Sequence, residues 1–116
     1  MLSREYMPVV YILYESDAQA YLMPYIEEIA HGVEEEGLLS DIISISEKQI
    51  QETAYRYALT VPLGISIGIG REFIVLMDKH VKDKRPVLEY SGISLAVCRK
   101  AGQNAVRLMK CKPLLP

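Results

Sequence analysis

The sequence predicts an α/β fold with three layers, in which helices cover both faces of a five-stranded mixed sheet that is mostly parallel. The first observation behind this prediction is an alternation of β-prone apolar runs with segments of helical apolar spacing, in the order β-α-β-α-β-β-β-α. The second is the short gap at Gly70 and Arg71, between the third and fourth runs. Such a gap can join only antiparallel neighbours, so the fourth strand should run against the others.

The first three elements are expected to be a strand, a helix and a strand. Residues 9–14 form an unbroken β-prone run, which is typical of a strand buried on both faces. A helix should begin near Gln19, tolerate Pro24 because it lies close to the first turn, and end at Gly37. The second strand is expected at residues 41–45. The apolar stripe of the helix consists of Leu22, Ile26, Ile29 and Val33.

The second half of the fold is expected to begin with another helix. Ser46 and Gln49 have the spacing of a capping box, and Pro62 should end this helix. Its buried stripe would consist of Ile50, Ala54, Tyr57 and Ala58. Three further strands and a final helix are expected at residues 63–69, 73–77, 87–90 and 94–110.

Charge is distributed unevenly along the chain. Residues 1–70 carry three Lys or Arg against eleven Asp or Glu, a net −8, whereas residues 71–116 carry ten against four, a net +6. The basic half lacks the interleaved aromatic residues of nucleic-acid-binding surfaces. This pattern favours protein contacts, or a simply dipolar surface, over nucleic-acid binding.

The length of 116 residues predicts one domain, residues 1–116, with a single hydrophobic core. The longest apolar run, residues 61–69, is interrupted by proline and glycine and is far too short to span a bilayer. No signal peptide is expected. On a single helix Cys98 and Cys111 would lie about 20 Å apart, beyond disulfide reach. We therefore expect a reduced, cytoplasmic protein without membrane contact.

No constellation of catalytic or cofactor-binding residues is apparent. The glycine-rich residues 64–70 lack the Gly-Lys-Ser/Thr of a phosphate loop, so their glycines should instead allow a helix or another backbone to approach. His31 and His80 have no partner at metal-ligand spacing and are expected at the surface. Ser66 lacks a nucleophile elbow, and Cys98 should pack within the last helix.

Three consecutive acids, Glu34, Glu35 and Glu36, occupy the last turn of the first predicted helix, where negative charge opposes the helix dipole. Taking about 100° per residue, Glu36 lies about 50° from the centre of the apolar stripe, Glu34 about 110° and Glu35 about 150°. Glu35 should therefore point furthest outward. The residues alone favour a solvated face, and the alternative is a carboxylate that meets a cation, or a basic or metal-bearing site of another protein.

Three motifs stand in register along the chain: GVEEEG at residues 32–37, PLGISIG at 62–68, and Arg99 followed by GQNAVRLMK at 102–110. Together with the chain length they resemble the small subunit of glycerol or propanediol dehydratase reactivase, over most of the sequence. The tyrosine-rich N-terminus and the basic loop at residues 79–85 depart from the pattern, and no role is carried over there.

The resemblance implies a non-catalytic accessory subunit of an ATP-dependent, chaperone-like machine. Its partners would be a large ATP-hydrolysing subunit and, through transient subunit exchange, an adenosylcobalamin-dependent dehydratase from which damaged cobalamin is released. By position, Glu35 would be a ligand in trans of Mg²⁺ near the ATP or ADP site of the large subunit. Glu34 and Glu36 would be surface charges of this interface, and the isolated chain would hold no cofactor.

Several assignments stay open. Asn104 and Arg107 could cap the last helix or tether it to the sheet, and Gly102 would let that helix lie close to the sheet. The alternatives for function are the medium subunit of the cobalamin-dependent dehydratase itself, or a stand-alone small-ligand-binding α/β domain. The sequence does not separate glycerol from propanediol systems, nor free cytoplasm from a bacterial microcompartment, and a homo-oligomer is an open state of the isolated chain.

Overall fold

The computed structural model describes residues 9–46 and 48–116. Within these residues, five strands and three α-helices form in the order in which the sequence predicts them, and a short 3-10 helix that the sequence did not predict follows the first strand. In chain order they are β1 (Val9–Glu15), η2 (Ser16–Ala18), α1 (Gln19–Glu35), β2 (Leu39–Ile45), α2 (Ile50–Thr60), β3 (Ile65–Ile69), β4 (Phe73–Asp78), β5 (Leu88–Ser91) and α3 (Leu95–Met109).

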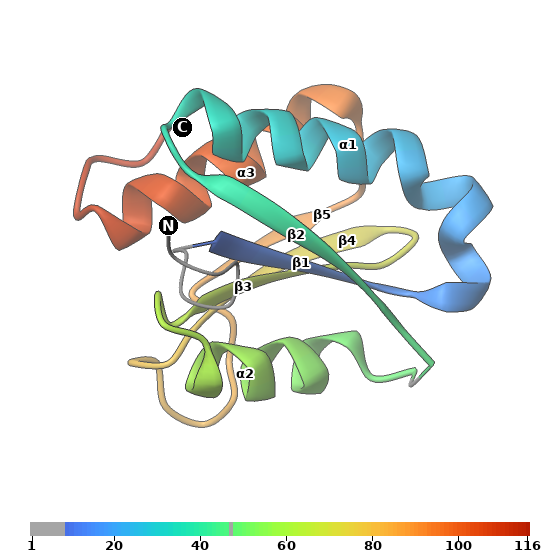
Figure 1. Cartoon of the computed structure of the whole chain (residues 1–116), viewed down its shortest axis with the longest axis horizontal. Helices are drawn as coiled ribbons and strands as arrows, with labels where there is room; N and C mark the ends of the chain where they lie inside the picture. Colours follow the sequence, from blue (N-terminus) through green and yellow to red (C-terminus); the bar gives the residue numbers. More distant parts are fainter. Residues whose placement is uncertain (1–8, 47) are drawn as a thin grey trace, which may run out of the picture.

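The strands form one sheet in the order β2-β1-β3-β4-β5 (Figure 1). β1 is paired in parallel with β2 on one side and with β3 on the other. β4 pairs antiparallel with both β3 and β5, so β4 alone runs against the other strands. This confirms the predicted mixed sheet and its reversed fourth strand.

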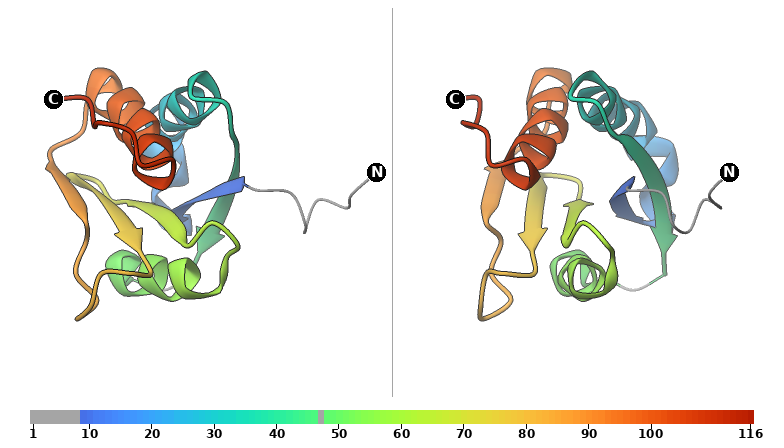
Figure 2. Two further views of the ribbon diagram at one scale, coloured as in Figure 1. Left: turned by 90° about the vertical axis from the view of Figure 1, so that its left-hand side faces the viewer. Right: turned by 60° about the vertical axis from the view of Figure 1, so that its left-hand side comes forward.

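Helices cover both faces of the sheet, which confirms the three-layer architecture. α1 and α3 lie side by side on one face, and α2 lies on the other (Figures 1 and 2). Successive residues of β1 point to opposite faces of the sheet. Ile12 packs in the cluster beneath α1 and α3, whereas Leu13 packs with Ile50 of α2. Because each face of the central strand is covered, β1 is an apolar run without alternation.

The apolar stripe predicted for the first helix is buried as expected: Leu22, Ile26, Ile29 and Val33 are inaccessible to solvent. Pro24 lies further into α1 than predicted, since it is the sixth residue of a helix that begins at Gln19. Its missing N–H leaves the carbonyl of Ala20 without a helical partner. Both residues are exposed, so water can reach that carbonyl.

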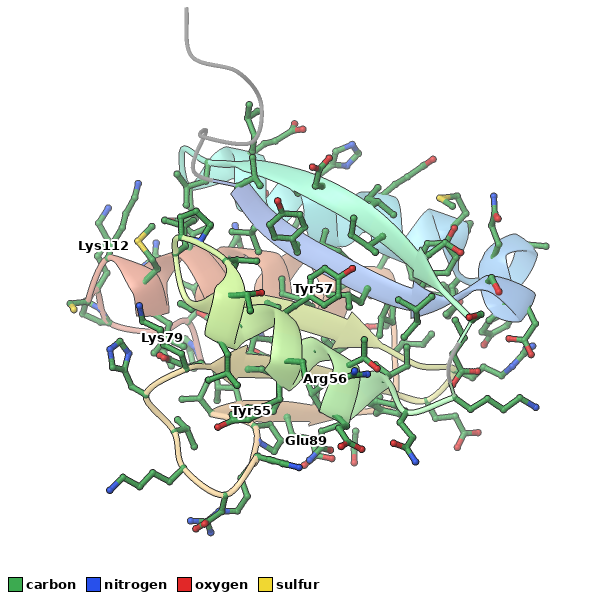
Figure 3. All side chains as sticks on the ribbon, turned by 60° about the horizontal axis from the view of Figure 1, so that its bottom comes forward. Tyr55, Arg56, Tyr57, Lys79, Glu89 and Lys112 are labelled. Atoms are coloured by element: carbon green, nitrogen blue, oxygen red, sulfur yellow. The ribbon has the colours of Figure 1, made fainter. Side chains whose placement is uncertain are left out.

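The beginning of α2 differs from the prediction. Gln49 occupies the N-cap position, and no side chain caps the helix there, so the expected capping box of Ser46 and Gln49 does not form. The buried stripe is close to the expected one, with Ile50, Ala54 and Ala58 in the core. Tyr57, which is labelled in Figure 3, is half-buried. Its ring packs against that of Tyr11, with 5.9 Å between the ring centroids.

Gly68, the glycine of β3, has the role that the sequence predicts for the glycines of residues 64–70, whereas Gly64 and Gly70 lie against the side chains of Lys79 and Phe73. A Cβ on Gly68 would overlap the side chain of Ile50 and would crowd that of Ala54, both on α2. Gly68 therefore allows α2 to pack directly on the middle of the sheet. Buried Ser66 of the same strand donates its hydroxyl hydrogen bond to the carbonyl of Ala54.

Candidate interaction site at the end of helix α1

The backbones of α1 and α3 touch through two glycines. A Cβ on Gly32 would overlap the carbonyl oxygen of Arg99, and a Cβ on Gly102 would overlap the carbonyl oxygen of Ile29. The expectation that Gly102 brings the last helix close to the sheet was wrong, because this glycine faces α1. The contact brings the C-terminal half of α1 beside α3, within side-chain reach of its basic residues.

Arg99 of α3 forms a bidentate ion pair with Glu35, the last residue of α1. Its Nε lies 2.5 Å from Oε1 of Glu35, and its Nη2 lies 2.7 Å from Oε2. The same guanidinium also donates a hydrogen bond to Glu28, with 3.2 Å between Nη1 of Arg99 and Oε1 of Glu28. Gln103, one turn further along α3, donates a longer hydrogen bond of 3.4 Å to Oε1 of Glu35.

This pair counters the unfavourable charge at the end of α1. The hydrogen bond from Arg99 is the largest influence on the carboxyl of Glu35 and holds its pKa below the usual range, while Glu35 in turn raises the pKa of Arg99. The positive guanidinium also lies where the helix dipole is negative. The conflict read from the sequence is therefore relieved within the chain itself.

The other two acids differ from each other. Glu36 is not the surface charge that was expected: its side chain is only 12 % exposed and accepts a 3.1 Å hydrogen bond from Nε of Arg107. Lys110 donates a 2.7 Å bond to the backbone carbonyl of Glu36. Glu34 is exposed and has no ion-pair partner within residues 9–46 and 48–116. Of the three side chains, Glu35 and Glu34 are thus the ones that a partner protein could contact.

The polar residues of α3 that hold this site were not assigned to it by the sequence analysis, although a signal for them exists. Arg99, Gln103, Arg107 and Lys110 follow one another at spacings of four, four and three residues, which place them on one face of α3. The side chains of Arg99 and Glu35 are 49 % and 39 % exposed, so the pair is open to solvent. Both charged groups are therefore accessible to another molecule.

Asn104 ties α3 to the sheet, as the sequence left open for it, whereas Arg107 bonds to the end of α1 and to the C-terminal residues instead of to the sheet. Asn104 is 2 % exposed, and its amide group donates to the hydroxyl of Tyr90 at 2.9 Å and to the carbonyl of Leu115 at 3.0 Å. Its Oδ1 accepts a 2.7 Å bond from the N–H of Leu115. Arg107 binds the carbonyl of Pro113 at 3.1 Å. Together they fix the C-terminal residues against α3.

The remaining candidates from the sequence behave as structural residues. Cys98 is buried, and burial raises the pKa of its thiol to about 11, whereas Cys111 is exposed. His31 and His80 are surface residues beside Glu28 and Asp78. Within the described part of the chain, no three His, Cys, Asp or Glu side chains are grouped to hold a metal ion. None of the described helices has the length and apolar character needed to cross a membrane.

A cavity of about 420 Å³ lies at the carboxyl ends of β1 and β3. Its walls include Glu15, Leu22, Arg71 and Phe73. The helices that follow β1 and β2 pack on opposite faces of the sheet, so β1 and β3 flank the point where the strand order reverses. Ligands of open α/β sheets bind in such crevices.

Comparisons with known proteins agree with this architecture. One similar structure is a diol dehydratase-reactivating factor, solved in complex with ADP and Mg²⁺. The alignment covers 94 % of this protein's chain and 98 % of the other chain, with a TM-score of 0.80 and 23 % sequence identity. Another is a glycerol dehydratase reactivase, for which the alignment covers 94 % of this protein's chain and 97 % of the other chain, with a TM-score of 0.82 and 24 % sequence identity. No curated protein sequence matches. The sequence model of the dehydratase medium subunit family spans residues 7–115, nearly the whole chain, and the protein therefore belongs to that family.

Proposed function

We propose that this protein is the non-catalytic small subunit of an ATP-dependent, chaperone-like reactivase, which releases damaged cobalamin from glycerol or diol dehydratase by subunit exchange. One observation carries the proposal: a chain of the dehydratase medium subunit family shares its fold, almost end to end, with chains of two dehydratase reactivases. Subunit exchange requires this relationship, because the exchanged subunits must present similar surfaces. ATP hydrolysis then belongs to the large subunit.

Glu35 is proposed to reach the large subunit and to supply one oxygen ligand to a Mg²⁺ ion beside its bound nucleotide. A carboxylate is the hard oxygen donor that Mg²⁺ prefers, and Mg²⁺ sites commonly take one or two carboxylates together with phosphates and waters. Arg99 donates one hydrogen bond to each oxygen of Glu35, which leaves acceptor capacity on Oε2. Glu34 is proposed as a second interface charge, whereas the charge of Glu36 is engaged by Arg107.

The wider setting follows from this assignment. The chain acts as one domain, residues 1–116, holds no cofactor of its own and meets Mg²⁺ and ATP or ADP only through the large subunit. Its partners are that subunit and, transiently, the dehydratase. The proposed location is the cytoplasm, either free or within a bacterial microcompartment.

The test of this proposal is reconstitution. The chain would be co-expressed with a reactivase large subunit, purified as a complex, and added with ATP and intact adenosylcobalamin to dehydratase that holds inactivated cobalamin. We expect co-purification and recovery of dehydratase activity that requires the chain, the large subunit and ATP together. Failure to form the complex, or recovery that is equally fast without the chain, would contradict the proposal.

A second candidate is the medium subunit of the dehydratase itself. The family to which the chain belongs favours it, and so does the cavity at the carboxyl ends of β1 and β3. A medium subunit would assemble with the large dehydratase subunit and contact cobalamin. Gel filtration of the chain mixed with hydroxocobalamin and either large subunit separates the two candidates. A stable cobalamin-containing complex with the dehydratase subunit would favour the second.

A further inference from the structure

Within residues 9–46 and 48–116, the outer edge of β2 is unpaired. β2 pairs with β1 along all seven of its residues, from Leu39 opposite Val9 to Ile45 opposite Glu15, without a bulge. Among the described residues no strand lies on its other side, so β2 ends the sheet (Figure 2). Backbone N–H and C=O groups along such an edge are a template for pairing with another strand.

β2 has few of the features with which sheet edges are commonly protected. It contains no Pro or Lys, and Asp41 is its single charged residue. Leu39 and Ile42 expose 51 % and 40 % of their surface. The opposite edge of the sheet is different, because β5 has only four residues and carries the exposed Glu89. Short, charged edges resist strand addition, whereas long apolar edges promote it.

The sequence of β2 is complementary to itself when it is read in the antiparallel direction. Placing Ile42 opposite the Ile42 of another copy aligns Ser40 with Ser44 and Leu39 with Ile45. The pairs formed by residues 39 and 45 and by residue 42 with itself are then apolar, and serines face serines, which are favourable cross-strand pairs. Asp41 lies opposite Ile43, so the two Asp41 carboxylates do not meet directly.

We propose that β2 is a strand-addition surface whose occupant is a second copy of this chain, paired antiparallel with Ile42 on the two-fold axis. The two five-stranded sheets would then form one continuous sheet, with the Ile42 side chains in contact on the face that carries α1 and α3. This inference goes beyond the proposed function and does not depend on it. The whole chain carries a net charge of only −2, so two copies repel each other weakly and the dimer should depend little on salt.

The first experiment is sedimentation velocity of the full chain over a range of concentrations and at two salt concentrations. Ile42→Lys would place two like charges directly opposite each other on the axis, while its exposure lets the monomer fold. Leu59→Lys is the matched control, because Leu59 is 51 % exposed on α2 and away from the edge. We expect wild type and Leu59→Lys to dimerise, with Ile42→Lys shifted at least about tenfold toward monomer. A wild type that stays monomeric, or a dimer that survives Ile42→Lys, would overturn the proposal.

The second experiment tests the register. In a Cys111→Ser background, which removes the exposed native thiol, Ile42→Cys should form a disulfide-linked dimer under mild oxidation, because directly opposed residues lie about 4.5–5.5 Å apart. Ser44→Cys is the control, since its two copies would be offset by four residues, or about 13 Å. Crosslinking at residue 44 as efficient as at residue 42 would overturn this pairing.

Discussion

Arg99 and Glu35 are 64 residues apart in the sequence, yet the guanidinium of one holds both carboxylate oxygens of the other. The pair joins the last turn of α1 to the first turns of α3, directly beside the contact of Gly32 with the backbone of α3. Both side chains are partly exposed, so another molecule can reach the pair. Glu35 is therefore held in a defined place before any partner binds.

Glu35→Gln tests the proposed Mg²⁺ ligand. The change keeps the size of the side chain and removes both the ion pair and the charge that opposes the helix dipole, so the melting temperature of the isolated chain should change little. Assembly with a reactivase large subunit in the presence of Mg²⁺ and ADP should weaken by about tenfold or more. Calorimetry of assembly, together with thermal melts, measures the two effects separately.

Glu34→Gln is the matched control for that substitution, because it removes one negative charge from the same helix end. It should alter assembly much less than Glu35→Gln. Equal assembly of wild type and both variants, with and without Mg²⁺, would show that Glu35 belongs to a solvated face.

Arg99→Gln should make the chain less sensitive to acid. The pKa of Glu35 is lower in the folded chain than in the unfolded chain. Ionised Glu35 therefore stabilises the fold at pH values above its unfolded pKa, and this contribution is lost as the pH falls through the folded pKa. Without Arg99 the pKa of Glu35 should return toward its ordinary value, and that part of the acid-induced loss should disappear. Thermal melts between about pH 6 and pH 2, with an NMR titration of Glu35, check this expectation.

Arg71→Gln provides the comparison, since it removes one exposed positive charge that lies over the ring of Tyr21, at 5.4 Å from its centroid. It should leave the titration of Glu35 unchanged. A shift of the Glu35 pKa as large in Arg71→Gln as in Arg99→Gln would mean that net charge, and not the ion pair, sets this pKa.

Gly102→Ala should destabilise the fold by about 1–3 kcal/mol or more, because the added methyl group overlaps the carbonyl of Ile29 and α1 must move away. Helix propensity alone predicts the opposite sign, a gain of up to about 1 kcal/mol. Ala96→Gly, at an exposed position of α3, reports the propensity effect without the contact. Urea denaturation measures both, and a stabilised Gly102→Ala variant would contradict the backbone contact between the helices.

Asn104→Ala should release the C-terminal residues. It removes the partners of the Tyr90 hydroxyl and of both backbone groups of Leu115, with an expected loss of about 1–3 kcal/mol. The amide of Leu115 should exchange with deuterium much faster than in wild type. Lys100→Ala, on the same helix, should leave that exchange rate as it is. Protection of Leu115 that persists in Asn104→Ala would show that other contacts hold the tail.

The order and type of the elements could be predicted from the sequence because they depend on local patterns. The unbroken run of β1, the spacing of Leu22, Ile26 and Ile29, and the short turn after β3 each lie within a few residues, and each acts through backbone geometry. One local pattern gave a wrong prediction, at the beginning of α2. Ser46 and Gln49 match a capping box, but α2 begins only after Gln49.

The tertiary structure alone decided which residues meet. No local pattern places β1 between β2 and β3, or turns Gly102 toward α1 instead of toward the sheet. The helical angle of Glu36 near the apolar stripe was visible in the sequence, but its partner Arg107 was not. These contacts join segments about 70 residues apart, and their energy depends on distances of a few ångströms that only the packed helices define. The sequence therefore determined the layers and the three acids at the end of α1. The packing of α1 on α3 determined that Arg99 holds Glu35 and that Arg107 holds Glu36, while Glu34 stays exposed.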